Sequence, residues 1–183
     1  LTKVYDFIWD VFCDWYIELA KPRLSAGAKQ SESAQRVLLF VFSGALKLLH
    51  PFMPFITEQI WQSLPNHNGA IIVADFPKYD KRLSFERESN DMERIMQTIG
   101  AIRTRRAEMN VPMSKKARLF IETKYTDLFK NAEAFYIKLA GASEVIIGSC
   151  DSDSAVKIVT ADATLYIPFE QLVDIEYAYR HVL

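Results

Sequence analysis

Residues 49–61 read LHPFMPFITEQIW, and together with FCDWYIELAKPRL at residues 12–24 they decide the fold of this chain. Apolar residues lead into and through the earlier block at spacings of three and four, at Val4, Ile8, Val11, Trp15 and Leu19. This spacing predicts an amphipathic α-helix. Pro22 disfavours the helical conformation at Lys21, so the helix is predicted to stop there.

A second helix is predicted for residues 32–49, after a polar loop over residues 25–33. The helix is apolar nearly all round, which is typical of a helix at the centre of a bundle. Pro51 and Pro54 break or kink it. A further short helix follows over residues 55–64.

A long crossing loop, residues 66–83, leads to the next predicted helix, and it contains a short extended stretch at residues 71–73. Ser84 is a candidate cap for that helix, which ends near residues 111–112. Its inward stripe consists of Met92, Ile95, Ile99, Ile102 and Met109. Residues 1–112 are therefore predicted to form one α-helical bundle.

Beyond residue 112 the apolar pattern alternates, which predicts strands. The expected strands are residues 119–121, 145–147, 156–159 and 164–167. A helix at residues 127–139, stopped by Gly141, lies between the first two. The fold class is thus mainly α: a helical bundle followed by a small α/β unit at residues 113–172, with a further helix starting at residues 173–183.

The composition excludes several classes of protein. The chain has 183 residues, of which 50% are hydrophobic, and a formal net charge of -1, so global charge gives no argument for nucleic acid. Its two cysteines, Cys13 and Cys150, are far apart, which favours a reduced, cytoplasmic setting over a disulfide framework. We find no apolar run long enough to span a bilayer and no signal peptide.

Catalytic motifs are missing from the sequence. It has no glycine-rich phosphate loop, and its histidines, His50, His67 and His181, stand apart from any metal-ligand or nucleophile–base spacing. His50 precedes a proline at the end of an apolar helix and is interpreted as a helix-terminus residue. We therefore predict no catalytic site, no metal site and no cofactor in this chain.

Local basic charge is the strongest functional signal. Six cationic side chains and one acidic side chain lie between residues 102 and 118, and four cationic and one acidic between residues 21 and 36. Cationic groups that contact phosphates release counterions and give salt-sensitive affinity. The predicted RNA contacts are Lys21, Arg23, Arg103, Arg106, Lys115 and Lys116.

Structural roles compete with this interpretation. Arg103, Arg105 and Arg106 lie near a predicted helix C-terminus, where cations favour the helix dipole. Arg106 is also seven residues after Ile99, on the inward stripe, where a partly buried position is expected. Aromatic residues could stack on RNA bases, but their helical spacing favours the core, at Trp9, Trp15, Phe40, Phe52 and Trp61.

The two opening blocks resemble the anticodon-binding region of class I aminoacyl-tRNA synthetases, and the valyl-tRNA synthetase family most closely. A third block, IRTRRAEMNVPMSKK at residues 102–116, resembles the arginine-rich helix and proline-containing connector of that family. LYIPFE at residues 165–170 and VDIE at residues 173–176 follow in the same order. The resemblance covers essentially the whole chain.

This resemblance implies a helical anticodon-binding domain, a small α/β segment and then a coiled-coil arm, which would begin near residue 173. It implies that the chain is an excised, non-catalytic piece whose bundle is truncated at its start. The parent enzyme would use ATP and magnesium to esterify valine to its tRNA, in catalytic and editing domains upstream. Valine tRNA is the implied partner, with no membrane and no metal, and the piece is expected to be a monomer.

PMSKK at residues 112–116 superficially resembles the lysine-rich signature loop of class I active sites. That loop works only beside a nucleotide-binding fold and its histidine motif, and the sequence shows neither.

Three alternatives to the valyl-tRNA synthetase resemblance remain. One is the same domain from an isoleucyl or leucyl enzyme, which the runs CDWY at residues 13–16 and AKPR at residues 20–23 disfavour. The others are a helical scaffold that docks proteins, and an independent enzyme, which lacks a convergent catalytic set.

Overall fold

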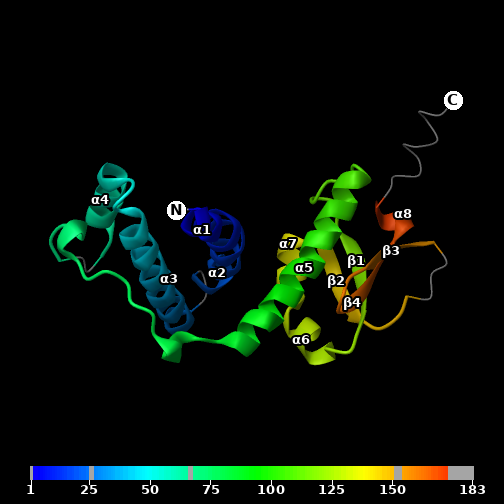
Figure 1. Cartoon of the computed structure of the whole chain (residues 1–183). Coiled ribbons are helices and arrows are strands. Elements are labelled where there is room, and N and C mark those ends of the chain that lie inside the picture. The colour runs from blue at the N-terminus through cyan, green and yellow to red at the C-terminus, as the bar shows by residue number, and fades with distance from the viewer. Residues whose placement is uncertain (1, 25–26, 66–67, 151–153, 173–183) are drawn as a thin grey trace. The chain divides into compact units, whose positions relative to one another are not determined.

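The computed structural model describes residues 2–24, 27–65, 68–150 and 154–172, and it contains two compact units, residues 1–82 and 83–183 (Figure 1). The first unit is helical. The second combines helices with a small four-stranded sheet. Among the described residues, no helix combines the length and the apolar character that a membrane crossing requires.

The first helical run differs in two ways from the single α-helix that the sequence predicts. It consists of α1 (Thr2–Asp6), a π-helical segment η1 (Phe7–Ile17) and α2 (Glu18–Leu24). The wider winding pairs residues five apart, and the ring centroids of Phe7 and Phe12 lie 6.4 Å from each other. The prediction that helix stops at Lys21 is wrong, because α2 continues through Leu24.

The two prolines after residue 50 set the next helix boundaries. Helix α3 (Ala28–Leu49) starts directly after Gly27, earlier than predicted, and ends before Pro51. Helix α4 (Pro54–Ser63) begins with Pro54, a position where the missing N–H costs no helical hydrogen bond. The stretch predicted to be extended, η2 (Ile71–Val73), is a short 3₁₀ turn.

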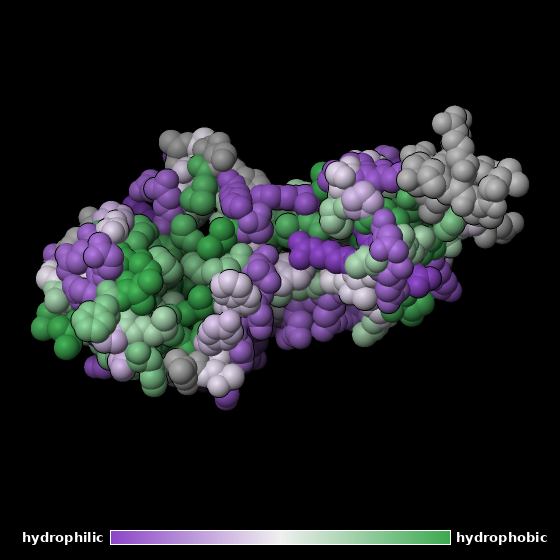
Figure 2. All heavy atoms as spheres, turned by 90° about the horizontal axis from the view of Figure 1, so that it is seen from above, coloured by the Kyte–Doolittle hydropathy of each residue, from purple (hydrophilic) through white to green (hydrophobic). Residues whose placement is uncertain are grey.

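One hydrophobic cluster of the first unit joins α3, α4 and η2. Leu46, Trp61 and Ile71 are buried together, and the Trp61 indole donates a hydrogen bond to the Gly69 carbonyl at 3.1 Å. Three aromatic residues that the sequence assigns to the core are instead on the surface: Trp9, Phe40 and Phe52 are 58%, 66% and 57% exposed. Hydrophobic areas mark the face of this unit seen in Figure 2.

The sheet of the second unit has the order β2-β1-β4-β3, with β1 parallel to β2 and antiparallel to β4, and with β3 antiparallel to β4. Its strands are β1 (Ala117–Thr123), β2 (Ala142–Ile147), β3 (Ala155–Val159) and β4 (Ala163–Pro168). The helix predicted between β1 and β2 is divided at Ala132 into α6 (Thr126–Asn131) and α7 (Glu133–Leu139). A short helix, α8 (Phe169–Leu172), follows β4.

One face of this sheet is buried, as the alternating pattern predicts. Leu119 and Ile121 of β1 are inaccessible, and Leu165 of β4 pairs with Ile121 on the same face. The buried helical side chains of the unit include Phe129, Tyr136, Ile99 and Ile102. On the opposite face of β1, Arg118 and Glu122 are exposed and Phe120 is half-buried.

Helix α5 (Glu86–Glu108) belongs to the second unit and is the longest element in it (Figure 1). The Thr98 and Tyr136 hydroxyls hydrogen-bond at 2.6 Å, and Arg94 pairs with Asp162 at 3.2 Å. These contacts tie α5 to the α/β elements. The units thus divide at residue 82, whereas the sequence predicts a bundle that extends to residue 112. The helix predicted to start at residue 173 lies outside the described residues.

Tyr136 should make the second unit less stable at alkaline pH. Burial raises the pKa of its phenol above the ordinary value near 10, an effect larger than the opposing hydrogen bond with Thr98. The folded protein therefore holds a proton that the unfolded chain releases, so stability present below pH ~10 is lost as pH rises above it, by up to ~1.4 kcal/mol per pH unit. Urea unfolding between pH 9 and 11 would measure this slope.

The variant Tyr136→Phe is the matched control for that slope. It lacks the titrating group, so its unfolding free energy should change less steeply with pH, even though the loss of the hydroxyl lowers it by about 1 kcal/mol at every pH. Equal slopes in the two proteins would contradict the prediction.

Candidate nucleic-acid interface

The six predicted RNA contacts fall into two groups, one in each unit. Lys21 and Arg23 lie in α2, while Arg103 and Arg106 lie in α5. Lys115 and Lys116 follow in the connector, which we define as residues 109–116, between α5 and β1. The structure thus describes one basic patch in each unit.

The cationic side chains on α2 are exposed. Lys21 forms an ion pair with Glu18, one helical turn before it. Burial raises the pKa of the Tyr16 phenol, and the nearby positive charge of Arg23 opposes part of that shift. Both cations can reach a ligand, because each side chain is exposed.

The second patch depends on how α5 ends. Asn110 has a φ of 53°, in the left-handed region that commonly terminates helices and that asparagine tolerates. The Val111 amide then donates to the Arg106 carbonyl at 2.8 Å. This turn reverses the chain, so the connector passes back beside the last turn of α5.

Arg106 is buried rather than displayed. Its side chain is 2% exposed, and its Nη1 atom donates to the carbonyls of Pro112 at 3.3 Å and Lys115 at 2.8 Å. Its Nη2 atom donates to the carbonyl of Gly141 at 3.1 Å. Burial lowers the pKa of the guanidinium. We therefore remove Arg106 from the RNA contacts, since its terminal nitrogens hold the connector and the residue before β2.

Arg103 and Lys116 meet at the end of α7. The Arg103 Nε atom donates to the Leu139 carbonyl at 2.8 Å, and the Lys116 Nζ atom donates to the Ile137 carbonyl at 3.0 Å. Terminal carbonyls of a helix carry partial negative charge, so both cations are favoured there. The fold thus brings together side chains from α5 and the connector that are thirteen positions apart in the sequence.

A hollow of about 490 Å³ opens beside these cations. Residues of α5, the connector and α7 line it: Arg103, Arg106, Ala107, Val111, Pro112, Met113, Lys138 and Leu139. Sequence reasoning did not single out Lys138. The signal that could have found it is its place in the last turn of the predicted helix 127–139, close to the basic block once the chain reverses.

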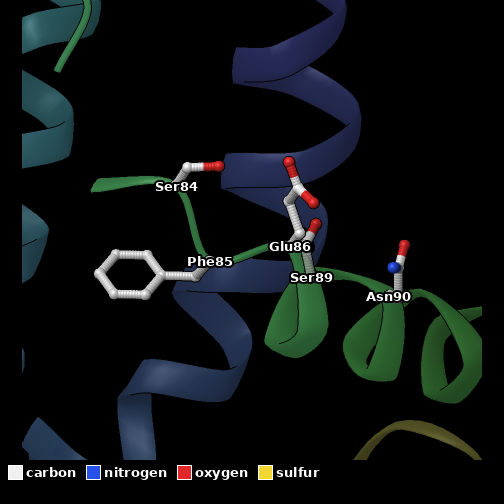
Figure 3. A pocket seen from close by; sticks show the side chains of 5 residues that line it. All are labelled: Ser84, Phe85, Glu86, Ser89 and Asn90. Atoms are coloured by element: carbon white, nitrogen blue, oxygen red, sulfur yellow. The ribbon is translucent and has the colours of Figure 1, made fainter. Parts of the chain in front are cut away.

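A second hollow, of about 420 Å³, lies at the start of α5 (Figure 3). Ser84, Phe85, Glu86, Ser89 and Asn90 line it. Ser84 does not cap the helix, since Phe85 occupies that position and makes no side-chain cap bond. The Glu86 carboxylate makes this a poor place for a phosphate.

Within the described ranges, no three or more His, Cys, Asp or Glu side chains gather as metal ligands would.

Comparison with known proteins agrees with this arrangement. Residues 1–121 match the family model of the anticodon-binding domain of tRNA ligase. The chain is 43% identical to "Valine--tRNA ligase" of Clostridium acetobutylicum over 94% of its length, and 41% identical to that of Geobacillus stearothermophilus over 94%. The corresponding protein of Clostridium tetani is 41% identical over 95%.

Each of these three alignments covers 20% of the relative, so the chain spans about a fifth of the length of the proteins it matches. The matched family model includes all of the first unit, α5, the connector and most of β1. On this match, the chain belongs to the anticodon-binding domain family of the tRNA ligases.

Proposed function

We propose that this chain binds the anticodon region of valine tRNA as the non-catalytic part of a valine–tRNA ligase. The observation that carries the proposal is the family match over residues 1–121, together with ligases of that name at about 40% identity over nearly the whole chain. The parent protein would attach valine to its tRNA in the cytoplasm, with ATP and magnesium bound by other domains. The chain itself would act as a monomer, without cofactor or metal.

The basic patches support this proposal. Lys21 and Arg23 of the first unit, and Arg103, Lys115 and Lys116 of the second, are the proposed contacts to RNA phosphates. Because Arg106 holds the connector by two carbonyls, Lys115 and Lys116 are presented on a fixed backbone. A rigid presentation lowers the entropy that binding costs.

Binding to valine tRNA should therefore depend on salt and on the connector lysines. The double variant Lys115→Gln, Lys116→Gln should lower the affinity about tenfold at low salt and reduce the slope of log K against log salt by up to about 2. Filter binding or fluorescence anisotropy at several salt concentrations would measure both. The matched control is Lys124→Gln, Lys130→Gln, which removes the same charge from exposed positions of the same unit outside the connector.

A loss of equal size in both double variants would show that net charge, rather than the connector, gives affinity. Equal affinity of the unmodified chain for valine tRNA and a non-cognate tRNA would place specificity outside these residues. If the chain bound no tRNA even at low salt, the proposal that it is itself an RNA-binding module would be wrong.

A further inference from the structure

We propose that the hollow between α5, the connector and α7 is a subsite for one nucleotide of an RNA chain, with its backbone phosphate on Arg103 and Lys138 and its sugar against the apolar wall. The subsite rests on the proposed function and makes it more specific, because it assigns one nucleotide of the RNA to this hollow. The phosphate chemistry could also come from free inorganic phosphate. The experiment below distinguishes the two sources.

The charge of the lining favours an anion. Among the described residues that line the hollow, Arg103, Arg106 and Lys138 are cationic and none is acidic. The ion pairs found in the described part of the chain join no carboxylate to Arg106. Its charge is therefore buried against carbonyls alone, an arrangement that an approaching anion stabilises.

Arg106 has unused hydrogen-bonding capacity as well as unneutralised charge. Its Nη atoms are engaged, but its buried Nε atom has no hydrogen-bond partner among the described residues. Buried donors without partners are uncommon in folded proteins and call for an explanation. A phosphate held by Arg103 and Lys138 would bring negative charge to the hollow that Arg106 also lines.

Size and polarity favour a nucleotide over a bare ion. A hollow of about 490 Å³ is larger than a single phosphate requires and falls within the roughly 300–1,000 Å³ that small-molecule sites span. Val111, Pro112 and Met113 form its apolar side. These side chains can pack against a ribose, while the cations on α5 and α7 take the phosphate.

The variant Lys138→Gln tests the subsite, and Lys130→Gln is its control. Both lysines lie in the last turn of a short helix, Lys138 in α7 and Lys130 in α6, and both are exposed, but only Lys138 lines the hollow. The probes are valine tRNA, the dinucleoside monophosphate UpU and inorganic phosphate. Amide NMR shifts of Met113 and Gly141 report occupancy, and the salt dependence of tRNA binding counts phosphate contacts.

We expect UpU to shift the Met113 and Gly141 amides saturably, and Lys138→Gln to weaken its affinity at least threefold. The same variant should lower the tRNA salt slope by about 0.7, the value for one lost phosphate contact on a single strand, while Lys130→Gln changes neither quantity. Lys138→Arg should restore both. Because Lys138 is exposed, these variants test the site without removing a buried group.

Three outcomes would overturn the subsite. The first is tRNA binding in which Lys138→Gln matches Lys130→Gln, which leaves the proposed function standing. The second is a change in the Met113 and Gly141 amide shifts that inorganic phosphate causes and that neither UpU nor tRNA reverses by competition, which would make the hollow a site for free anions. The third is the absence of any shift with UpU. Failure of the unmodified chain to bind tRNA, with UpU still bound at the hollow, would instead contradict the proposed function and support the nucleotide subsite.

Discussion

The variant Arg106→Leu should lower the free energy of unfolding of the second unit by about 3 kcal/mol or more. Leucine fills part of the same volume but removes the three hydrogen bonds that the charged guanidinium donates to the carbonyls of Pro112, Lys115 and Gly141, and a hydrogen bond to a charged group contributes about 1.5–3 kcal/mol. The Pro112 and Gly141 carbonyls keep their backbone donors, the amides of Lys115 and Ala117. Relief from burying a charge offsets part of this cost. Hydrogen exchange of the β1 amides during urea denaturation would measure the loss.

The chain contains an internal control for this measurement. Its three tryptophans, Trp9, Trp15 and Trp61, all belong to the first unit, so tryptophan fluorescence follows that unit alone. We expect the fluorescence transition to stay in place while the β1 amides lose protection. The neighbouring variant Arg105→Gln removes only an exposed pair with Glu108 and should change stability by less than about 0.5 kcal/mol. A loss below 1 kcal/mol for Arg106→Leu would contradict the structural role given to Arg106.

Arg106 also shows what the sequence could and could not predict. Its place seven residues after Ile99 predicts an inward side chain, and the structure confirms burial. The carbonyls that receive its hydrogen bonds lie up to 35 residues away, beyond any local pattern. Position on a helical stripe can therefore be predicted from spacing, whereas the partner that makes a buried cation tolerable depends on tertiary packing.

The boundary between the units could not be predicted from local spacing either. The stripe of α5 predicts that Ile95, Ile99 and Ile102 face a core, and they are buried. Periodicity does not say whether that core belongs to a helical bundle or to a sheet. In the structure, α5 is hydrogen-bonded to Tyr136 and Leu139 of the second unit, and α3 belongs to the first unit. For the same reason Lys138 was missed, because its closeness to Arg103 arises only when α7 packs beside α5.

In the first unit, helical spacing of aromatic residues does not indicate burial. Trp9 follows a helical period and so was assigned to the core, yet its ring stacks on exposed Tyr5 with centroids 6.4 Å apart. An amphipathic period states only that one face is apolar. Whether that face is covered depends on neighbouring segments, which a local pattern does not specify.

The variant Gly141→Ala should destabilise the second unit by about 2–5 kcal/mol. Gly141 has a φ of +69°, and the left-handed conformation costs an L-residue about 1–2 kcal/mol. A Cβ atom there would lie 3.1 Å from the Met113 carbonyl oxygen and 3.2 Å from the Arg106 Cζ atom. Overpacking of such a buried site adds about 1–3 kcal/mol. The β1 amide exchange measurement used for Arg106 would report the loss.

Gly100→Ala is the matched control, and it should act in the opposite direction. Gly100 lies inside α5 with no atom within 4 Å of the added Cβ, so alanine should stabilise the helix by about 0.5–1 kcal/mol. The combination with Arg106→Leu tests the mechanism further. If the alanine methyl acts by displacing the Arg106 guanidinium from Lys115 and Gly141, the double variant should lose less than the sum of the single losses, by about 1 kcal/mol or more. Strict additivity would show that backbone strain at Gly141 alone accounts for the effect.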